Sequence, residues 1–393
     1  MTASRTPSPI SPRISAIHPS LTLSIAAKAR ELTARGETVW SFSAGEPDFD
    51  TPEHIKAAAI RSLQDGQTKY TAADGLPALQ KAIAAKLEAE NGLRYRPDQI
   101  LISGGAKHSI FNAVMALCGE GDEVIVPGPY WLSYPEMISV AGARPVIVAA
   151  REEAGFKLTP AEIEAAVTPR TKLLILNSPS NPTGVVYGES ELRAIGETAV
   201  RHGIWILSDE IYEKLIYGGA RHASVGALSP ALHERTLTVN GFSKAYSMTG
   251  WRLGYCAGPA EVVKAMSALQ SHSTSAPCTF VQYGGVEALK ASQDCVVRMA
   301  RAFEERRDRM HERLKAMELP CVKPGGAFYM FPNIGRFGMG SIAFAERLLV
   351  ERRVAVVPGL PFGSDSHIRL SYACSMDAIE RGMDALAQFV ASL

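Results

Sequence analysis

Seven short apolar runs, bounded by glycine, proline or asparagine, constrain the fold of this 393-residue chain more than any other feature. The stretches between them are amphipathic, as in Glu189–His202. Buried parallel strands that alternate with covering helices are typical of this pattern. The sequence therefore predicts an α/β fold with a mostly parallel sheet, whose ligand sites lie at the carboxyl ends of the strands. The runs are Leu101–Ser103, Glu123–Pro127, Pro145–Ala149, Lys172–Leu176, Ile204–Ser208, Leu237–Asn240 and Leu253–Ala257.

The pattern changes after about residue 282, where we expect a smaller α+β domain. At 393 residues the chain is long enough for two packed domains. The predicted parts are an N-terminal arm (1–20), a segment of the small domain (21–45), the large domain (46–282) and the small C-terminal domain (283–393). The expected elements after 282 are a long charged helix Val281–Met317, a strand Ala327–Phe331, a helix Ser341–Arg352, strands Val354–Val357 and His367–Tyr372, and a final helix to Leu393.

Charge and cysteine content narrow the classes of partner. Lys and Arg total 41 against 40 Asp and Glu, so nothing favours nucleic acid or a charged membrane as a partner. No apolar run reaches about 18 residues, so no transmembrane helix is expected. The six cysteines form no C-x-x-C pair, which favours a cytoplasmic protein without a metal or disulfide framework. Met1–Pro12 lacks the apolar stretch of a signal peptide and is interpreted as a flexible arm.

The segment Ser243–Gly254, SKAYSMTGWRLG, combines a lysine with an arginine eight positions later. A lysine amine can form a Schiff base with a carbonyl compound, and an arginine can hold a phosphate through forked hydrogen bonds. Pyridoxal 5′-phosphate requires both groups from its host protein. A single lysine is most often a solvated surface charge. The neighbours of Lys244 are small, apolar and interrupted by glycine, so we favour a reactive amine beside Arg252.

Two further motifs follow predicted strands. NSPSNPTG at Asn177–Gly184 follows one run, and SDEIY at Ser208–Tyr212 closes the next. Together with the lysine segment, they closely resemble the fold-type I pyridoxal-phosphate enzymes, and within these the class I aminotransferases, most like the bacterial aspartate aminotransferases. The resemblance extends from about Ala16 to the C-terminus. It implies a large domain with a mostly parallel, seven-stranded sheet, a smaller α+β domain, and pyridoxal 5′-phosphate as the cofactor.

The resemblance assigns roles around the cofactor ring. Lys244 would bind the cofactor aldehyde and then move the proton of the substrate Cα. Asp209 would face the pyridine nitrogen and keep the ring protonated. Asn181 and Tyr212 would hydrogen-bond the phenolic oxygen, and Trp131 would stack on the ring. Without the resemblance, Asp209 could cap a helix, Asn181 could be a turn residue, and the two aromatic residues could belong to the core.

The same resemblance places the cofactor phosphate at a helix N-terminus. Gly105, Ala106 and Lys107 open a predicted helix after a strand, and its N–H groups and dipole would hold an anion together with Ser243 and Arg252.

Tyr70 bears on whether two subunits share each active site. By resemblance, Tyr70 would reach the phosphate of the neighbouring subunit, so the enzyme would be a homodimer with shared active sites. The alternative is that Tyr70 packs within its own fold.

Substrate binding is assigned to residues from both predicted domains. Arg369 alternates with apolar residues on the strand His367–Tyr372, and a charge on such a strand needs a partner. The resemblance makes this partner the α-carboxylate of the substrate; a structural salt bridge is the alternative. Gly45, Trp131 and Asn181 would also contact the substrate, and Gly45 belongs to a segment that moves on closure.

The preferred side chain depends on Lys107 and His18. By resemblance, Lys107 would contact a distal carboxylate, which favours aspartate, glutamate, oxaloacetate and 2-oxoglutarate. Relatives that aminate prephenate often carry a lysine or arginine where this chain has His18, and histidine is only partly charged near neutral pH. Prephenate activity therefore stays open.

The resulting hypothesis is a ping-pong aminotransferase that moves the amino group between L-aspartate or glutamate and a 2-oxo acid. Aromatic, alanine or prephenate aminotransferases and a carbon–sulfur β-lyase are alternatives that use the same lysine, aspartate and arginine. A degenerate cofactor-fold domain used only for binding is a further alternative. The complete set of catalytic positions and the lack of a basic patch argue against it.

Overall fold

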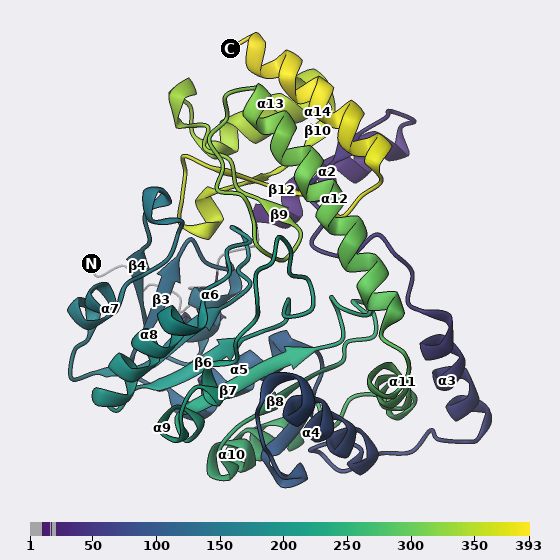
Figure 1. The fold of residues 1–393 in the computed structure, drawn as a ribbon, viewed down its shortest axis with the longest axis vertical. Coiled ribbons are helices and arrows are strands. Elements are labelled where there is room, and N and C mark those ends of the chain that lie inside the picture. The colour runs from purple at the N-terminus through teal and green to yellow at the C-terminus, as the bar shows by residue number, and fades with distance from the viewer. Residues whose placement is uncertain (1–9, 16, 18–20) are drawn as a thin grey trace, which may run out of the picture.

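The computed structural model describes residues 10–15, 17 and 21–393. His18 and most of the predicted N-terminal arm lie outside the described residues, apart from a short helix α1 (Pro12–Ser15). Figure 1 shows two bodies. The large body is built on one seven-stranded sheet, and the small body, above it in the view, carries two short sheets and the C-terminal helix. Among the described helices, none is long and apolar enough to span a bilayer.

The large sheet has the strand order β2-β8-β7-β6-β5-β3-β4. Strand β8 runs antiparallel to its neighbours β2 and β7, and the other pairs are parallel. The predicted α/β fold with a mostly parallel sheet is therefore confirmed, and each apolar run is a strand whose ends differ by at most one residue from the prediction. The strands are β2 (Ile100–Ser103), β3 (Glu123–Gly128), β4 (Arg144–Ala149), β5 (Thr171–Asn177), β6 (Trp205–Asp209), β7 (Thr236–Gly241) and β8 (Gly254–Ala257).

Alternation along the strands explains why helices cover both faces of this sheet. In β5, Leu173 and Ile175 face one hydrophobic cluster, whereas Leu174 and Leu176 face another. The first cluster is completed by helices α5 (Ala106–Leu117), α6 (Ser133–Val140) and α10 (Ala260–Ser271). The second is completed by α7 (Pro160–Ala166), α8 (Glu189–Arg201) and α9 (Pro230–His233). Helices α3 (Glu53–Gln64), α4 (Pro77–Asn91) and α11 (Thr279–Lys290) pack at the β2 edge.

The small body joins residues from both ends of the chain. Its two-stranded sheet pairs Trp40–Ser41 (β1) with Val354–Ala355 (β10) in parallel. Its three-stranded sheet has the order β11-β12-β9 and is antiparallel. The predicted domain boundaries at 45/46 and 282/283 stay predictions. The remaining elements are β9 (Tyr329–Met330), β11 (Val357–Pro358), β12 (Ile368–Ser371), α2 (Leu21–Ala34), α12 (Asp294–Ala316), α13 (Ser341–Arg352) and α14 (Met376–Ala391).

The prediction of a single helix Val281–Met317 is wrong. The structure has two helices here, because α11 ends at Lys290 and α12 begins at Asp294. The side-chain amide of Gln293 donates to the carbonyl oxygens of Ala288 and Ala291 at 3.0 and 2.9 Å, which closes the end of α11. Helix α11 then packs on α3 and α4 in the large body, whereas α12 continues along the small body (Figure 1).

The predicted strand Val354–Val357 is also divided. Ala355 pairs with Ser41 in one sheet, and Val357 pairs with Arg369 in the other, so Val356 carries the chain between two sheets. A sequence pattern shows the apolar run but not this change of partner.

A buried ion pair fastens α4 to the turn after β6. Lys86 on α4 forms an ion pair with Glu213, and both side chains are less than one-tenth exposed. Asn91 donates to the second carboxylate oxygen of Glu213 at 2.7 Å. Lys86 lowers the pKa of Glu213, which therefore stays ionised in spite of its burial.

We expect Lys86→Ala to lower the free energy of unfolding by about 3–5 kcal/mol, because the buried Glu213 carboxylate loses its ammonium partner and keeps only the imidazole of His222, 3.9 Å away, as a basic neighbour. Urea unfolding near pH 7 measures this loss. The control is Arg94→Ala, whose ion pair with Glu88 is exposed and should contribute at most about 1 kcal/mol. Equal losses for the two variants would contradict the prediction.

Candidate active site

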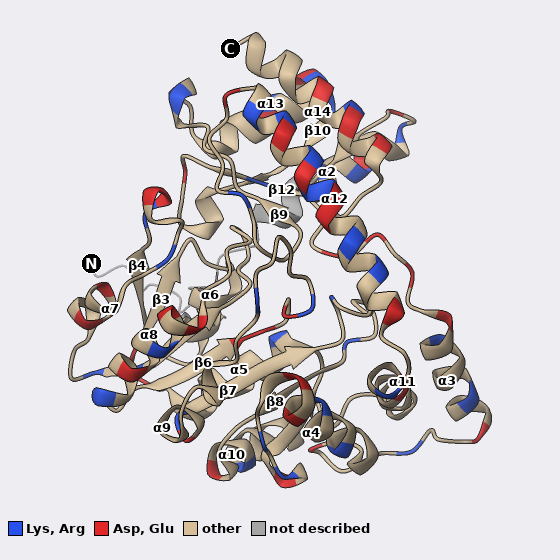
Figure 2. Cartoon of the chain, in the orientation of Figure 1, with Lys and Arg blue, Asp and Glu red and all other residues tan. Residues whose placement is uncertain are grey.

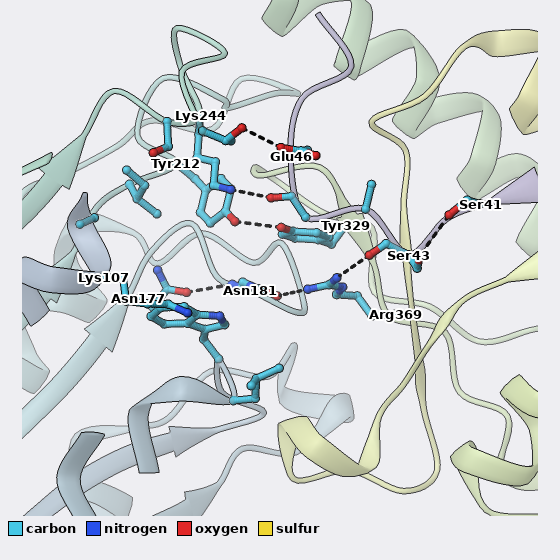
Figure 3. Close-up of a pocket in the computed structure, with 18 of the residues that line it drawn as sticks. Ser41, Ser43, Glu46, Lys107, Asn177, Asn181, Tyr212, Lys244, Tyr329 and Arg369 are labelled. Carbon is cyan, nitrogen blue, oxygen red and sulfur yellow. Dashed lines mark hydrogen bonds between the residues drawn. The ribbon is translucent and has the colours of Figure 1, made fainter. Parts of the chain in front are cut away.

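A cavity of about 900 Å³ lies where the two bodies meet. The large body contributes residues at the carboxyl ends of its strands: Asn177 ends β5, Asp209 ends β6, and Lys244 follows β7. The small body contributes Tyr329 and Arg369 from its three-stranded sheet. Figure 3 labels four of these side chains, those of Asn177, Lys244, Tyr329 and Arg369, and shows them converging on one space, as expected for the crevice at the strand ends of an α/β sheet.

Lys244 is the nucleophilic candidate of the cavity. It is half-buried in the turn after β7, and its Nζ donates to the carbonyl oxygen of Gly45 at 2.5 Å. Burial, and next the positive charge of Arg369, lower the pKa of Lys244 to about 8. More of the amine is therefore neutral near physiological pH than for an ordinary lysine, which favours nucleophilic and proton-transfer chemistry.

Asp209 is a carboxylate buried at the end of β6, with 4% of its surface exposed. Its oxygens accept hydrogen bonds from the hydroxyl of Tyr134 at 2.6 Å and from the backbone N–H of Ile211 at 3.3 Å. Burial raises the pKa of Asp209 to about 6. Among the described residues, no cation forms an ion pair with it, so the carboxylate can receive a positively charged group from the cavity.

Hydrogen bonds connect the ends of β5 and β6 to the small body. The side-chain amide of Asn177 donates to the Asp209 carbonyl at 3.0 Å, and its oxygen accepts from the backbone N–H of Asn181 at 2.8 Å. Asn181 in turn accepts from Arg369 at 3.1 Å (Figure 3). The hydroxyls of Tyr212 and Tyr329 lie 2.9 Å apart. Two separate sets of hydrogen bonds therefore link the two bodies across the cavity.

One end of the cavity is built for an anion. Helix α5 begins at Ala106, and no side chain caps its first N–H groups. Gly105, at φ 90°, lets Arg252 come close, since a Cβ there would lie 2.7 Å from the Arg252 Nη2. Ser243 lines the same cavity. A helix N-terminus next to a guanidinium and a hydroxyl is a phosphate-binding arrangement.

Arg369 lies on β12 with 5% of its surface exposed. It donates to Asn181 and, at 3.3 Å, to the carbonyl of Ser43, and it stacks 4.3 Å from the Tyr329 ring centre. Its Nε is buried without a partner. The structural salt bridge considered as an alternative is not formed with any of the described residues. Arg369 therefore keeps donors for a carboxylate that enters the cavity.

Lys107 is a further cation that lines the cavity. Its Nζ lies 4.8 Å from the ring centre of Trp131, and no described carboxylate pairs with it. Burial, together with the charge of Arg252, lowers the pKa of Lys107. Trp131 packs edge to face on Tyr134 with ring centres 5.3 Å apart, so the indole is held in place beside the cavity.

The cavity brings together most of the residues predicted for the site. Two do not line it: Gly105 lies directly beside it, and Tyr70 is 96% exposed on the surface of the chain. The residues that line it are Gly45, Ala106, Lys107, Trp131, Asn181, Asp209, Tyr212, Ser243, Lys244, Arg252 and Arg369.

Among the lining residues that were not predicted as site residues, Tyr134, Tyr329 and Arg30 carry polar groups. Tyr134 follows Trp131 by three positions, and its backbone N–H donates to the Trp131 carbonyl at 3.0 Å at the start of α6, so the short spacing could have suggested it. Tyr329 lies within a predicted strand, and nothing in that strand singled out its hydroxyl. Arg30 reaches the cavity from α2, far from every motif.

Comparisons with known proteins agree with this geometry. Residues 37–386 match the family model described as aminotransferase class I and II. The chain is 48% identical to an aspartate aminotransferase of Geobacillus stearothermophilus over 96% of this chain and 98% of that protein. It is 47% identical to an aspartate/prephenate aminotransferase of Cereibacter sphaeroides over 98% of this chain and 99% of that protein.

The solved structure of a Thermus thermophilus aspartate aminotransferase with maleate superposes with a TM-score of 0.93. It is 45% identical in sequence and covers 96% of this chain and 99% of that chain. The agreement of sequence, fold and cavity over nearly the whole length confirms the resemblance drawn from the motifs. The chain belongs to the class I and II aminotransferases, enzymes that transfer amino groups with pyridoxal 5′-phosphate.

Proposed function

We propose that this enzyme transfers the amino group between L-aspartate or L-glutamate and a 2-oxo acid. One observation carries the choice of substrate: Lys107 and Arg369 face the same cavity as Lys244, and neither has a carboxylate partner among the described residues. Figure 3 places these two cations on opposite sides of Asn181. Two separated cations suit a substrate with two carboxylates.

The cavity fits pyridoxal 5′-phosphate at three points. The first turn of α5, with Arg252 and Ser243, offers donors to a phosphate. The buried carboxylate of Asp209 has no cation and suits a protonated ring nitrogen. Lys244 supplies an amine of lowered pKa. When bound, the cofactor supplies an electron-accepting ring that stabilises negative charge at the substrate Cα.

Proton transfer and substrate binding would then be carried out by different side chains of the protein. Lys244 takes the proton from the substrate Cα and returns a proton later, which its pKa of about 8 permits near neutral pH. Arg369 orients the α-carboxylate, and Lys107 the distal one. Tyr134 holds Asp209 in place, because its hydroxyl donates to that carboxylate at 2.6 Å.

We extend the proposal to a homodimer with shared active sites. Tyr70 supports it, since an aromatic side chain that is 96% exposed lacks packing in its own chain. The expected cytoplasmic location stays a prediction.

Prephenate is a second candidate substrate, because the Cereibacter sphaeroides relative is an aspartate/prephenate aminotransferase by name. His18, on which this reading depended, lies outside the described residues. Rates for prephenate measured beside those for 2-oxoglutarate decide between the two.

Lys244→Ala should lower transamination of aspartate by at least about 10²–10⁴-fold, because the site loses its proton-transfer group. The assay is a panel of donors (aspartate, glutamate, alanine and phenylalanine) with 2-oxoglutarate and prephenate as acceptors. Lys290→Ala, which changes an exposed lysine on α11, is the matched control and should retain full activity. Alanine or phenylalanine turning over faster than aspartate would overturn the proposed substrate but not the family.

Lys107→Ala should lower kcat/KM for aspartate by about 10- to 100-fold, because one carboxylate loses a charged hydrogen-bond donor. The value for phenylalanine should fall much less, since that side chain carries no carboxylate. Lys107→Arg, which keeps the charge, should restore part of the aspartate activity. Equal losses for aspartate and phenylalanine would contradict this role.

Mixing two defective variants tests the shared site. Tyr70→Ala and Lys244→Ala should each impair the homodimer, whereas a mixed dimer has one site that carries neither change. After subunit exchange, activity should return to roughly a quarter of the wild-type value, because half of the dimers are mixed. Light scattering should give twice the 42.3 kDa of one chain. An active monomer, or no recovery on mixing, would refute the shared site.

A further inference from the structure

A polar cluster outside the cavity joins the two bodies close to Arg369. Glu152 lies in the turn after β4 in the large body, whereas His367 and Asn333 belong to the small body. The Glu152 carboxylate accepts from the Asn333 amide at 2.7 Å and from the His367 Nε2 at 3.2 Å, both at the same oxygen. The side chains of His367 and Glu152 are 5% and 20% exposed, so the contact is largely shielded from water.

Hydrogen bonds at both ring nitrogens and a stacked aromatic ring hold the imidazole of His367 in place. Its Nδ1 lies 2.7 Å from the hydroxyl of Ser364 and 3.0 Å from that of Ser366. The ring stacks on Phe331 with ring centres 4.8 Å apart and planes 6° apart. Burial lowers the pKa of His367, so the ring is neutral near pH 7. Because a carboxylate can only accept, the ring donates from Nε2 and accepts at Nδ1.

His367 also sets the start of the strand that carries Arg369. Its carbonyl accepts from the Gly359 N–H at 2.9 Å, and β12 begins at the next residue. A Cβ on Gly359 would lie 2.3 Å from that carbonyl oxygen, so the backbone approach is tight. A displacement of His367 would therefore move the beginning of β12.

The spacing of His367 and Arg369 directs both side chains to the large body. Residues two apart in an extended segment point to the same side. His367 meets Glu152 there, and Arg369 meets Asn181 at 3.1 Å. The strand is thus held to the large body at two successive positions on one face.

We propose that Glu152 and His367 are positioning residues that fix Arg369 for the α-carboxylate of the substrate. The inference rests on the proposed function of Arg369 and goes beyond it, since neither residue lines the cavity. Asn333 strengthens the contact because it donates to the same carboxylate oxygen. Without the acceptor on Glu152, two buried donors lose their partner, and the guanidinium loses its fixed orientation.

Glu152→Ala tests the proposal in the complete, cofactor-loaded enzyme. KM for aspartate should rise by about 10- to 100-fold with little change in kcat, because a carboxylate-binding group is misplaced while the proton-transfer group is not. The dissociation constant for maleate, an unreactive dicarboxylate, should rise by the same factor in calorimetry. Glu164→Ala is the matched control, because Glu164 meets His202 at the same 3.2 Å on the exposed surface. It should leave both constants unchanged.

The conservative variant separates hydrogen bonding from charge. In Glu152→Gln the amide oxygen can still accept from the neutral His367 and from Asn333, so KM should stay near the wild-type value. Glu152→Gln also keeps the proposal testable if the Glu152→Ala protein does not fold. A KM as high as expected for the alanine variant would overturn the proposal.

A double-mutant cycle decides whether Glu152 acts through Arg369. In an Arg369→Ala background, Glu152→Ala should cause little further loss of maleate binding, because the group that it positions is gone. Fully additive losses would overturn the positioning role and leave only a general structural one. Failure of the wild type to transaminate any donor would instead refute the proposed function, so the two failures are distinguishable.

Discussion

Charges that are buried without an ion-pair partner govern the arrangement of this cavity. Among the described residues, Asp209 meets no cation and Arg369 meets no carboxylate, although each is at most 5% exposed. Such burial is costly unless hydrogen bonds offset it. Tyr134 supplies one to Asp209, and Asn181 supplies one to Arg369. A direct pair between the two charges would have cancelled both, whereas their separation leaves each able to bind a ligand group of opposite charge.

The parallel sheet makes this separation possible. Strands β5, β6 and β7 lie side by side, so their carboxyl ends deliver Asn177, Asp209 and Lys244 to one edge. The small body, whose β1 and β10 join distant parts of the sequence, supplies Arg369 from the opposite side (Figure 3). Charged residues are otherwise spread over the outer helices, and α12 carries residues of both signs (Figure 2). Binding therefore depends on local geometry and not on the overall field.

Much of the fold and of the site could be predicted from the sequence, for identifiable reasons. Buried strands leave continuous apolar runs, and the motifs around Asp209 and Lys244 are contiguous in the chain, so both were recognised. The break between α11 and α12 was missed because it depends on where Gln293 donates its hydrogen bonds. Tyr329 was missed because its approach to Tyr212 is tertiary. The same holds for Glu152 and His367, which the fold alone brings together.

The environments of Asp209 and Lys244 have a joint consequence for proton movement. Burial brings their pKa values from the usual 3.8 and 10.5 to about 6 and about 8. Transfer of a proton from the amine to the carboxylate would cost about 9 kcal/mol at the usual values and only about 3 kcal/mol at the shifted ones. The interior thus narrows the gap in proton affinity between the two groups from nearly seven pKa units to about two, and the amine remains the stronger base. A ligand bound between Asp209 and Lys244 therefore meets an acid and a base that differ far less in proton affinity than the same groups do in water.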